Sequence, residues 1–187
     1  MVPLTHLWLP VVLSALAVFF VSSLMHMVLP HHRNDYAKLP EEELLLEGLR
    51  RVSLSPGDYS FPRPDRIQDF RSPEMAAKLE RGPVGMMTVL PSGPPAMGKA
   101  MGFWLVYCLV IGVFVAYLTG RTVAPGAGFL PVFRVSGTAA FLAFSAALPI
   151  DSIWLGRSWS ATFKHVLDGL VYAVASGALF GWLWPAG

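Results

Sequence analysis

Long apolar runs constrain the fold of this chain more than any other feature. Four of them reach the roughly 20 residues that a helix needs to cross about 30 Å of hydrocarbon. They are residues 7–30, 101–119, 131–155 and 166–184. The chain is 54% hydrophobic and 14% charged, which is not the balance of a soluble domain. The sequence therefore predicts an all-α membrane protein with four transmembrane helices.

Two other interpretations of these runs are weaker. No segment alternates polar and apolar residues over several strands, as a transmembrane barrel requires. The first run resembles a secretory signal in length, but its flank MVPLTH has no Lys or Arg and no small-residue cleavage pattern follows it. We therefore expect a retained helix. Cys108, the only cysteine, lies inside the second run, which leaves no disulfide framework or thiolate metal cluster.

A polar connector, residues 31–99, separates the first helix (1–30) from the other three (100–187). It contains ten Lys or Arg and ten Asp or Glu, so it is not a basic surface for nucleic acid or anionic lipid. We expect no nucleic-acid partner. The bilayer and other membrane protein subunits, including further copies of this chain, are the expected partners.

Helix and strand signals in the connector predict a small α+β unit. Pro40, with three glutamates after it and two arginines at 50 and 51, suits the dipole of a short amphipathic helix. Ser72, Pro73 and Gly82 are typical of the start and end of a second helix. The segments DYSFP and PVGMMTVLP predict a minimal hairpin.

The distribution of positive charge predicts the orientation in the membrane. With four helices, the face of the connector carries five Lys or Arg near helix ends and the opposite face carries two. These are Arg33, Lys38, Lys99, Arg157 and Lys164 against Arg121 and Arg134. The bias places the connector in the cytoplasm and both termini on the external side of the membrane.

Three of the five histidines lie in the stretch MHMVLPHHRNDY, residues 25–36. On a helix, the adjacent His31 and His32 would point about 100° apart, and no further ligand recurs at a suitable spacing, so we expect no metal site. They mark the cytoplasmic boundary instead. His26 in the first helix and His165 at the start of the fourth lie at matched depth. They are candidates for holding a haem, or they simply reach water and headgroups.

Charged residues near the last two helices predict an intramembrane cluster of Asp151, Arg157, Lys164 and Asp168. Asp168 is the most informative, because an ionisable residue within a span is costly and usually has a partner. The sequence favours a structural ion pair over a role in handling protons. A proton or small-solute conduit around Asp168 is the weaker alternative.

Small residues predict close helix packing. Ala173, Gly177 and Gly181 form a stripe at four-residue spacing, and Gly112 and Ala116 offer a matching groove on the second helix. The pattern does not distinguish a contact within the chain from one with a partner subunit.

No motif names a reaction: the sequence has no phosphate-binding loop, nucleophile elbow or HExxH. We therefore expect no catalytic residues and favour a non-enzymatic membrane protein acting through protein–protein interaction, as an accessory subunit or a small homo-oligomer. The alternative is a haem- or metal-binding redox subunit that uses His26 and His165; otherwise no cofactor is expected.

Four segments carry a resemblance: HHRNDYAKLPEEE, PGDYSFP, GPVGMMTVLPSGPP and DGLVYAVASGALFGWLWP. Together the chain resembles a group of small uncharacterised bacterial inner-membrane proteins. The resemblance implies a bacterial source and a four-helix membrane fold, and it brings no activity or site residue with it.

Overall fold

Three helices are long and apolar enough to cross a membrane in the computed structural model, which describes residues 1–186. They span Leu4–Met27, Met97–Thr122 and Phe129–Trp154. The first consists of a 3-10 turn, η1 (Leu4–Leu7), and α1 (Trp8–Met27), and the second is α4 (Met97–Thr122). These match three of the four expected spans, so the protein is mostly helical and has the character of a multi-pass membrane protein.

The third of these helices is interrupted, unlike the continuous run expected from sequence. α5 (Phe129–Ser145) ends before a short turn, and α6 (Pro149–Trp154) follows. Pro149 occupies the first turn of α6, where its missing N–H costs nothing, whereas inside a continuous helix it would remove a hydrogen bond. Pro149 therefore explains why one apolar run becomes two helices.

The fourth expected span folds as α7 (Trp159–Trp182), a helix of 24 residues. It is not among the three apolar helices, because its first half carries Lys164, His165 and Asp168. Those polar residues are the ones that build the site described below.

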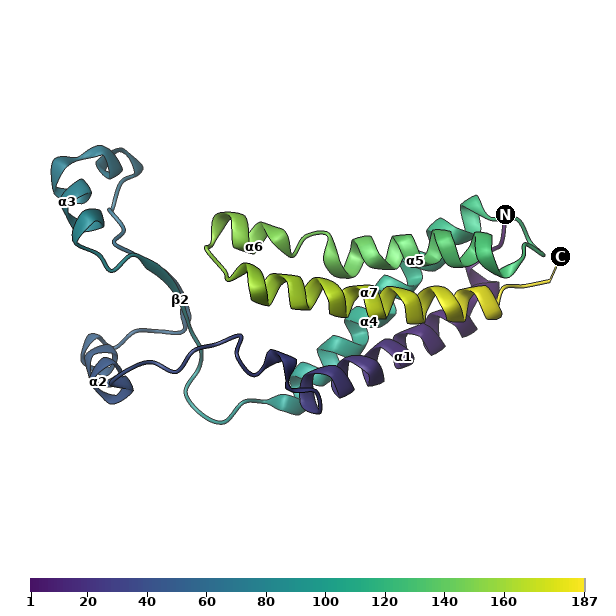
Figure 1. Cartoon of the computed structure of the whole chain (residues 1–187), viewed down its shortest axis with the longest axis horizontal. Helices are drawn as coiled ribbons and strands as arrows, with labels where there is room; N and C mark the ends of the chain where they lie inside the picture. Colours follow the sequence, from purple (N-terminus) through teal and green to yellow (C-terminus); the bar gives the residue numbers. More distant parts are fainter. Residues whose placement is uncertain (187) are drawn as a thin grey trace. The chain divides into compact units, whose positions relative to one another are not determined.

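α1, α4, α5 and α7 pack against one another in one compact unit, Met1–Ala37 together with the chain from Ala96 onward. α5 and α7 lie side by side over most of their length (Figure 1). At one end of the unit Val2 N–H donates to the Gly120 carbonyl at 2.8 Å, and Trp184 Nε1 donates to the Ala124 carbonyl at 2.9 Å. The start of α1, the end of α4 and the end of α7 therefore meet at this end.

The small-residue stripe is used for packing inside the chain. A Cβ built on Gly177 would lie 3.1 Å from the Gly137 Cα and from the Phe133 carbonyl oxygen of α5, and one on Gly181 would meet the Phe129 ring. Gly112 faces Val11 of α1 instead, and Ala116 and Ala173 are buried. The stripe and the expected groove thus pack on different helices and do not match each other.

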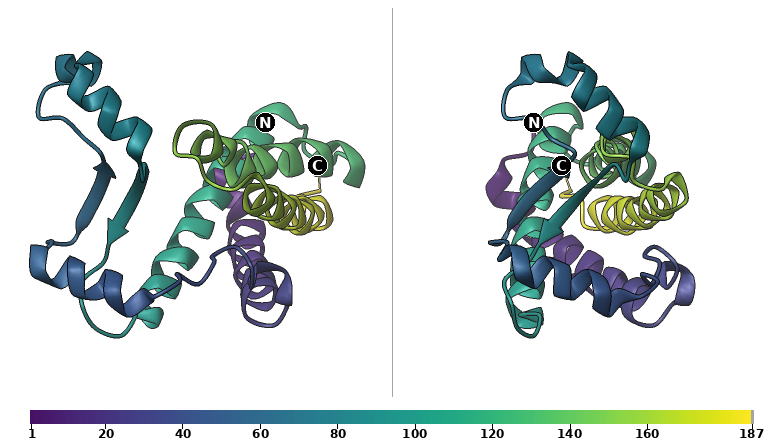
Figure 2. Two further views of the ribbon diagram at one scale, coloured as in Figure 1. Left: turned by 60° about the vertical axis from the view of Figure 1, so that its left-hand side comes forward. Right: turned by 90° about the vertical axis from the view of Figure 1, so that its left-hand side faces the viewer.

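The connector forms the second compact unit, Lys38–Pro95. Its elements are α2 (Glu42–Val52), β1 (Gly57–Phe61), the 3-10 helix η3 (Ile67–Arg71), α3 (Pro73–Arg81) and β2 (Gly85–Val89). β1 and β2 pair antiparallel (Figure 2), with Tyr59 opposite Met87 in the register. The Ser72 hydroxyl caps α3 by accepting from the Met75 N–H at 3.2 Å. The expected hairpin and second helix are both present, while α2 begins two residues after Pro40.

Replacing Gly177 with alanine tests the α5–α7 contact. Because the added methyl group meets backbone atoms of α5, the two helices have to separate, and we expect Gly177→Ala to lower the free energy of unfolding by about 1–3 kcal/mol. Gly102→Ala on α4 is the matched control, since nothing lies within 4 Å of its Cβ position. Thermal unfolding in detergent measures both. Equal stability of the two variants would contradict this packing.

Candidate metal centre

Four histidines and two aspartates converge where α1 ends and α7 begins. His26 is in the last turn of α1, while His31 and His32 lie in η2 (Pro30–His32), a separate 3-10 turn that Pro30 starts. His165 and Asp168 are three residues apart on α7 and share a face of the helix. All of these elements belong to the same compact unit.

The carboxylate of Asp168 is the centre of this cluster, and its side chain is only 3% exposed. His31 Nε2 lies 3.1 Å from its Oδ1, and His32 Nε2 lies 2.7 Å from its Oδ2. His26 Nε2 and His165 Nδ1 are each 3.8 Å from the same Oδ2. A buried charge is stable only when it is paired, and here imidazoles from three elements supply the pairing.

Asp35 forms a second acidic position behind the first, with a side chain 4% exposed. His32 Nδ1 donates to its Oδ2 at 2.6 Å, and Lys164 Nζ donates to its Oδ1 at 2.7 Å. Burial by itself raises the pKa of Asp35, but the hydrogen bonds and charges of Lys164 and His32 outweigh it and lower the pKa to about 2. Asp35 is therefore ionised and links η2 to α7.

The imidazole rings form a stack that leaves no space for a porphyrin between His26 and His165. The His32 ring lies 4.4 Å from the His26 ring and 4.7 Å from the His165 ring, centroid to centroid. The outer two rings are themselves only 5.8 Å apart. The two histidines do come together as their matched depth suggested, but the geometry does not fit a haem held between them.

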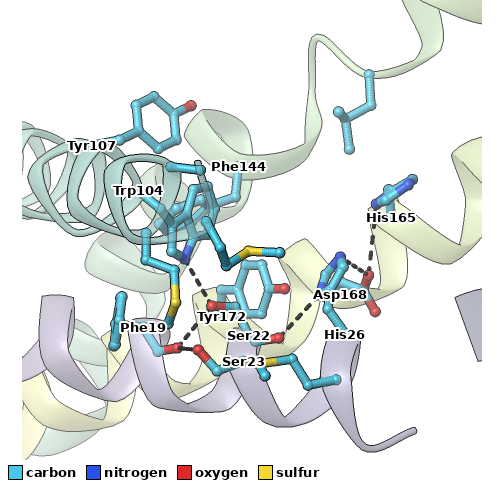
Figure 3. A pocket seen from close by; sticks show the side chains of 15 residues that line it. Phe19, Ser22, Ser23, His26, Trp104, Tyr107, Phe144, His165, Asp168 and Tyr172 are labelled. Carbon is cyan, nitrogen blue, oxygen red and sulfur yellow. Dashed lines mark hydrogen bonds and ion pairs between the residues drawn. The ribbon is translucent and has the colours of Figure 1, made fainter. Parts of the chain in front are cut away.

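Four donor atoms of the cluster lie close enough together to be candidate ligands of one metal ion. One ligand atom each from His26, His32, His165 and Asp168 lies within 4.8 Å of the others. Imidazole nitrogen with carboxylate oxygen is a donor set that suits zinc and the neighbouring divalent transition metals. Figure 3 shows His26, His165 and Asp168 meeting at the edge of a cavity. The arrangement is therefore a candidate metal centre.

The charged residues predicted from the sequence divide into two groups. Asp151 and Arg157 form a partly exposed ion pair at 3.9 Å. Lys164 pairs with Asp35, not with Asp168 one turn later on α7. The expected single cluster of four charges is therefore an ion pair beside a histidine–aspartate centre.

His32 and Asp35 are the functional residues that sequence reasoning missed. We expected no metal at His31 and His32 because the two side chains would diverge on a regular helix, whereas Pro30 starts a new turn and His32 approaches His26 and His165. Two spacings carried the missing signal: His32 with Asp35, and His165 with Asp168, are each three residues apart.

No protein-family model matches the chain, and neither a curated protein nor a solved structure matches it. Its function is therefore argued from the geometry of the site.

Replacing Asp35 with asparagine tests its linking role. The change keeps the shape of the side chain but leaves Lys164 and His32 without a charged partner, so we expect Asp35→Asn to lower the free energy of unfolding by about 1.5–3 kcal/mol. Asp151→Asn is the matched control: its ion pair is long and half exposed, so about 0.5 kcal/mol or less is expected. Denaturant unfolding of metal-free protein in detergent measures both. An Asp35→Asn variant as stable as the control would contradict this role.

Proposed function

We propose that this chain is a multi-pass membrane protein that binds a divalent transition metal ion through His26, His32, His165 and Asp168. The observation that carries the proposal is the convergence of four ligand atoms within 4.8 Å, from α1, η2 and α7. Exposed acidic groups often gather without an ion, but here Asp168 is buried and the other three donors are imidazoles.

The charges around His32 favour a cation at this position. His32 Nε2 and Asp168 Oδ2, 2.7 Å apart, share a proton in a hydrogen bond, and a metal ion would displace that proton. Two carboxylates, Asp35 and Asp168, face a single lysine in the cluster. A divalent ion would offset this excess of negative charge, and His32 Nε2 and Asp168 Oδ2 would be two of its ligands.

Outer hydrogen bonds hold the imidazoles ready for a metal. His32 Nδ1 donates to Asp35, and His26 Nδ1 donates to the Ser22 carbonyl at 3.0 Å, so the Nε2 atoms of both rings are left for the ion. His31 contacts the second oxygen of Asp168. A ligating histidine oriented by a carboxylate or a backbone carbonyl is the usual arrangement around zinc. Three nitrogens and one oxygen make a tetrahedral zinc-type ion the best fit.

The interaction hypothesis stays a second proposal, as an accessory subunit or homo-oligomer. One of its supports from sequence was the small-residue stripe, but Gly177 and Gly181 pack on α5 within this chain. The conduit hypothesis depended on Asp168, whose two oxygens contact His31 and His32. The metal-binding hypothesis is the one that specific contacts favour.

We further propose that α7 is a fourth span, in a bacterial inner membrane, with the connector cytoplasmic. α7 packs along α5 and α1, and its exposed side chains include Phe163, Leu167 and Val174, which suit contact with lipid. Its polar residues Lys164, His165 and Asp168 instead contact the cluster. With this orientation the metal centre lies near the cytoplasmic boundary, where the first helix ends.

Metal binding should depend on the cluster and not on histidine content. Purified protein stripped with a chelator should bind one equivalent of Zn²⁺, and Co²⁺ should give the visible absorption of a tetrahedral site. We expect His32→Ala and His165→Ala to weaken affinity by at least about 100-fold, because each removes a ligand and not merely an outer partner. His6→Ala is the matched control, since His6 is exposed in η1, outside the cluster.

Two results would contradict the metal assignment. One is zinc affinity that falls equally in the His6 and His32 variants. The other is a cobalt spectrum of an octahedral ion with water ligands, which would indicate loose association with surface carboxylates.

Reporter fusions test the fourth span. A phosphatase that is active only in the periplasm should be active when fused after α7 and inactive when fused in the connector after β2. A fluorescent protein that matures only in the cytoplasm should give the opposite pattern. If α7 does not cross the membrane, both fusion points lie on the same side and report alike.

A further inference from the structure

A cavity of about 460 Å³ lies against the candidate metal centre. Its walls come from α1, α4, α5 and α7, and they are mostly apolar and aromatic, including Phe19, Trp104 and Phe144 (Figure 3). Its size and lining are typical of a site for a small molecule. Met27 and Met97, which also line it, are exposed at the end of α1 and the start of α4. The cavity therefore reaches the surface between two helix ends.

Three of the four candidate ligands face this cavity. His26, His165 and Asp168 line it, whereas His32, whose ring stacks on those of His26 and His165, does not. An ion held by the cluster is thus adjacent to the cavity at its polar end. The rest of the lining is apolar, so a molecule in the cavity would place a polar group at the metal and an apolar body among the aromatic rings.

Tyr172 provides an independent indication of a ligand. It lines the cavity one helical turn beyond Asp168, on the same face of α7, and is only 4% exposed. Its hydroxyl is the one buried side-chain polar atom without a hydrogen-bond partner in residues 1–186. A buried polar group left unpaired is costly, and the cavity is the place from which an acceptor can reach it. The neighbouring Trp104 is already satisfied, because its Nε1 donates to the Ser22 hydroxyl at 2.8 Å.

The charge of the metal centre indicates which kind of polar group a molecule in the cavity would carry. This step rests on the proposed metal site: Asp35 and Lys164 offset each other, which leaves a divalent ion with one carboxylate, Asp168, and a net positive charge. In a poorly hydrated site such a centre attracts an anion. The hydrogen atom of the Tyr172 hydroxyl likewise needs an acceptor. A carboxylate head group satisfies both requirements, because it is an anion for the metal ion and a hydrogen-bond acceptor for the Tyr172 hydroxyl.

We propose that the cavity binds a single-chain lipid carboxylate, a long-chain fatty acid, with its head at the metal and Tyr172 and its tail among Phe19, Trp104 and Phe144. The opening between the ends of α1 and α4 suits this ligand, because an amphiphile in a bilayer places its head at the boundary and its tail in the hydrocarbon. Binding is reversible and involves no covalent step.

Bromine quenching of Trp104 tests the proposal. Zinc-loaded protein in phosphatidylcholine nanodiscs is titrated with a brominated stearic acid, and the same titration of Trp104→Phe is subtracted to remove the signal of the other five tryptophans. We expect saturable quenching. Tyr172→Phe should weaken the affinity by about tenfold or more, since it removes one hydrogen bond to a charged group. Tyr117→Phe, an exposed tyrosine of α4 outside the cavity, should leave the affinity unchanged.

Head-group variants make the test specific. The brominated fatty alcohol of the same length should bind at least about tenfold more weakly than the acid, and removing the metal with a chelator should weaken the acid to the level of the alcohol. Equal affinity for acid and alcohol overturns the proposal. So does an affinity for the acid that is unchanged in Tyr172→Phe, or an isoprenoid quinone that displaces the brominated acid more effectively than unlabelled stearate does.

Metal content measured on the same samples separates the two proposals. If zinc is bound at the cluster but the acid gives no saturable quenching, the fatty-acid site is wrong and the metal site stands. If no zinc binds, the metal site is wrong and the fatty-acid proposal fails with it.

Discussion

The buried carboxylate of Asp168 is the constraint on which the rest of the helical unit depends. It lies on a helix that is otherwise apolar over most of its length, with its side chain 3% exposed, so its charge has to be compensated by neighbours. Most of the compensation comes from outside α7: His26 approaches from α1, and His31 and His32 approach from η2. One acidic residue thereby determines where the end of the first helix must lie.

The same pairing explains why the histidines gather so closely. Four imidazoles side by side repel one another as soon as they carry charge, and only carboxylates between them offset this repulsion. Asp168 and Asp35 lie on either side of His32, at 2.7 and 2.6 Å, and Lys164 in turn contacts Asp35. Such a network of nitrogen and oxygen donors, fixed from behind and facing a cavity, is what a metal site requires. Structural pairing and the proposed ion binding therefore depend on one arrangement.

Much of the fold could be predicted from the sequence, because apolar runs and capping residues act locally. The three apolar spans, the Ser72 cap and the hairpin all depend on residues close together in the chain. Asp168 and His26 were also predicted as residues of interest, since a polar group within a span is costly. The break between α5 and α6 was not predicted, because it depends on one residue, Pro149, inside an otherwise apolar run.

The composition of the site could not be predicted in the same way. His32 joins it because Pro30 starts a separate 3-10 turn that contacts both α1 and α7, and Lys164 contacts Asp35 across 129 positions of sequence. Neither fact follows from helical periodicity. The packing partner of Gly177 could not be predicted for a similar reason. A stripe of small residues indicates that another helix packs closely against it, but it does not indicate which helix.

X-ray absorption at the zinc edge tests the central claim most directly, because it reports the ligands of a bound ion without any substitution. For zinc-loaded protein we expect four nitrogen or oxygen neighbours at about 2.0–2.1 Å, together with the outer-shell scattering of about three imidazole rings. Six oxygen neighbours without imidazole scattering would contradict it, since the ion would then lie on surface carboxylates and not among His26, His32 and His165.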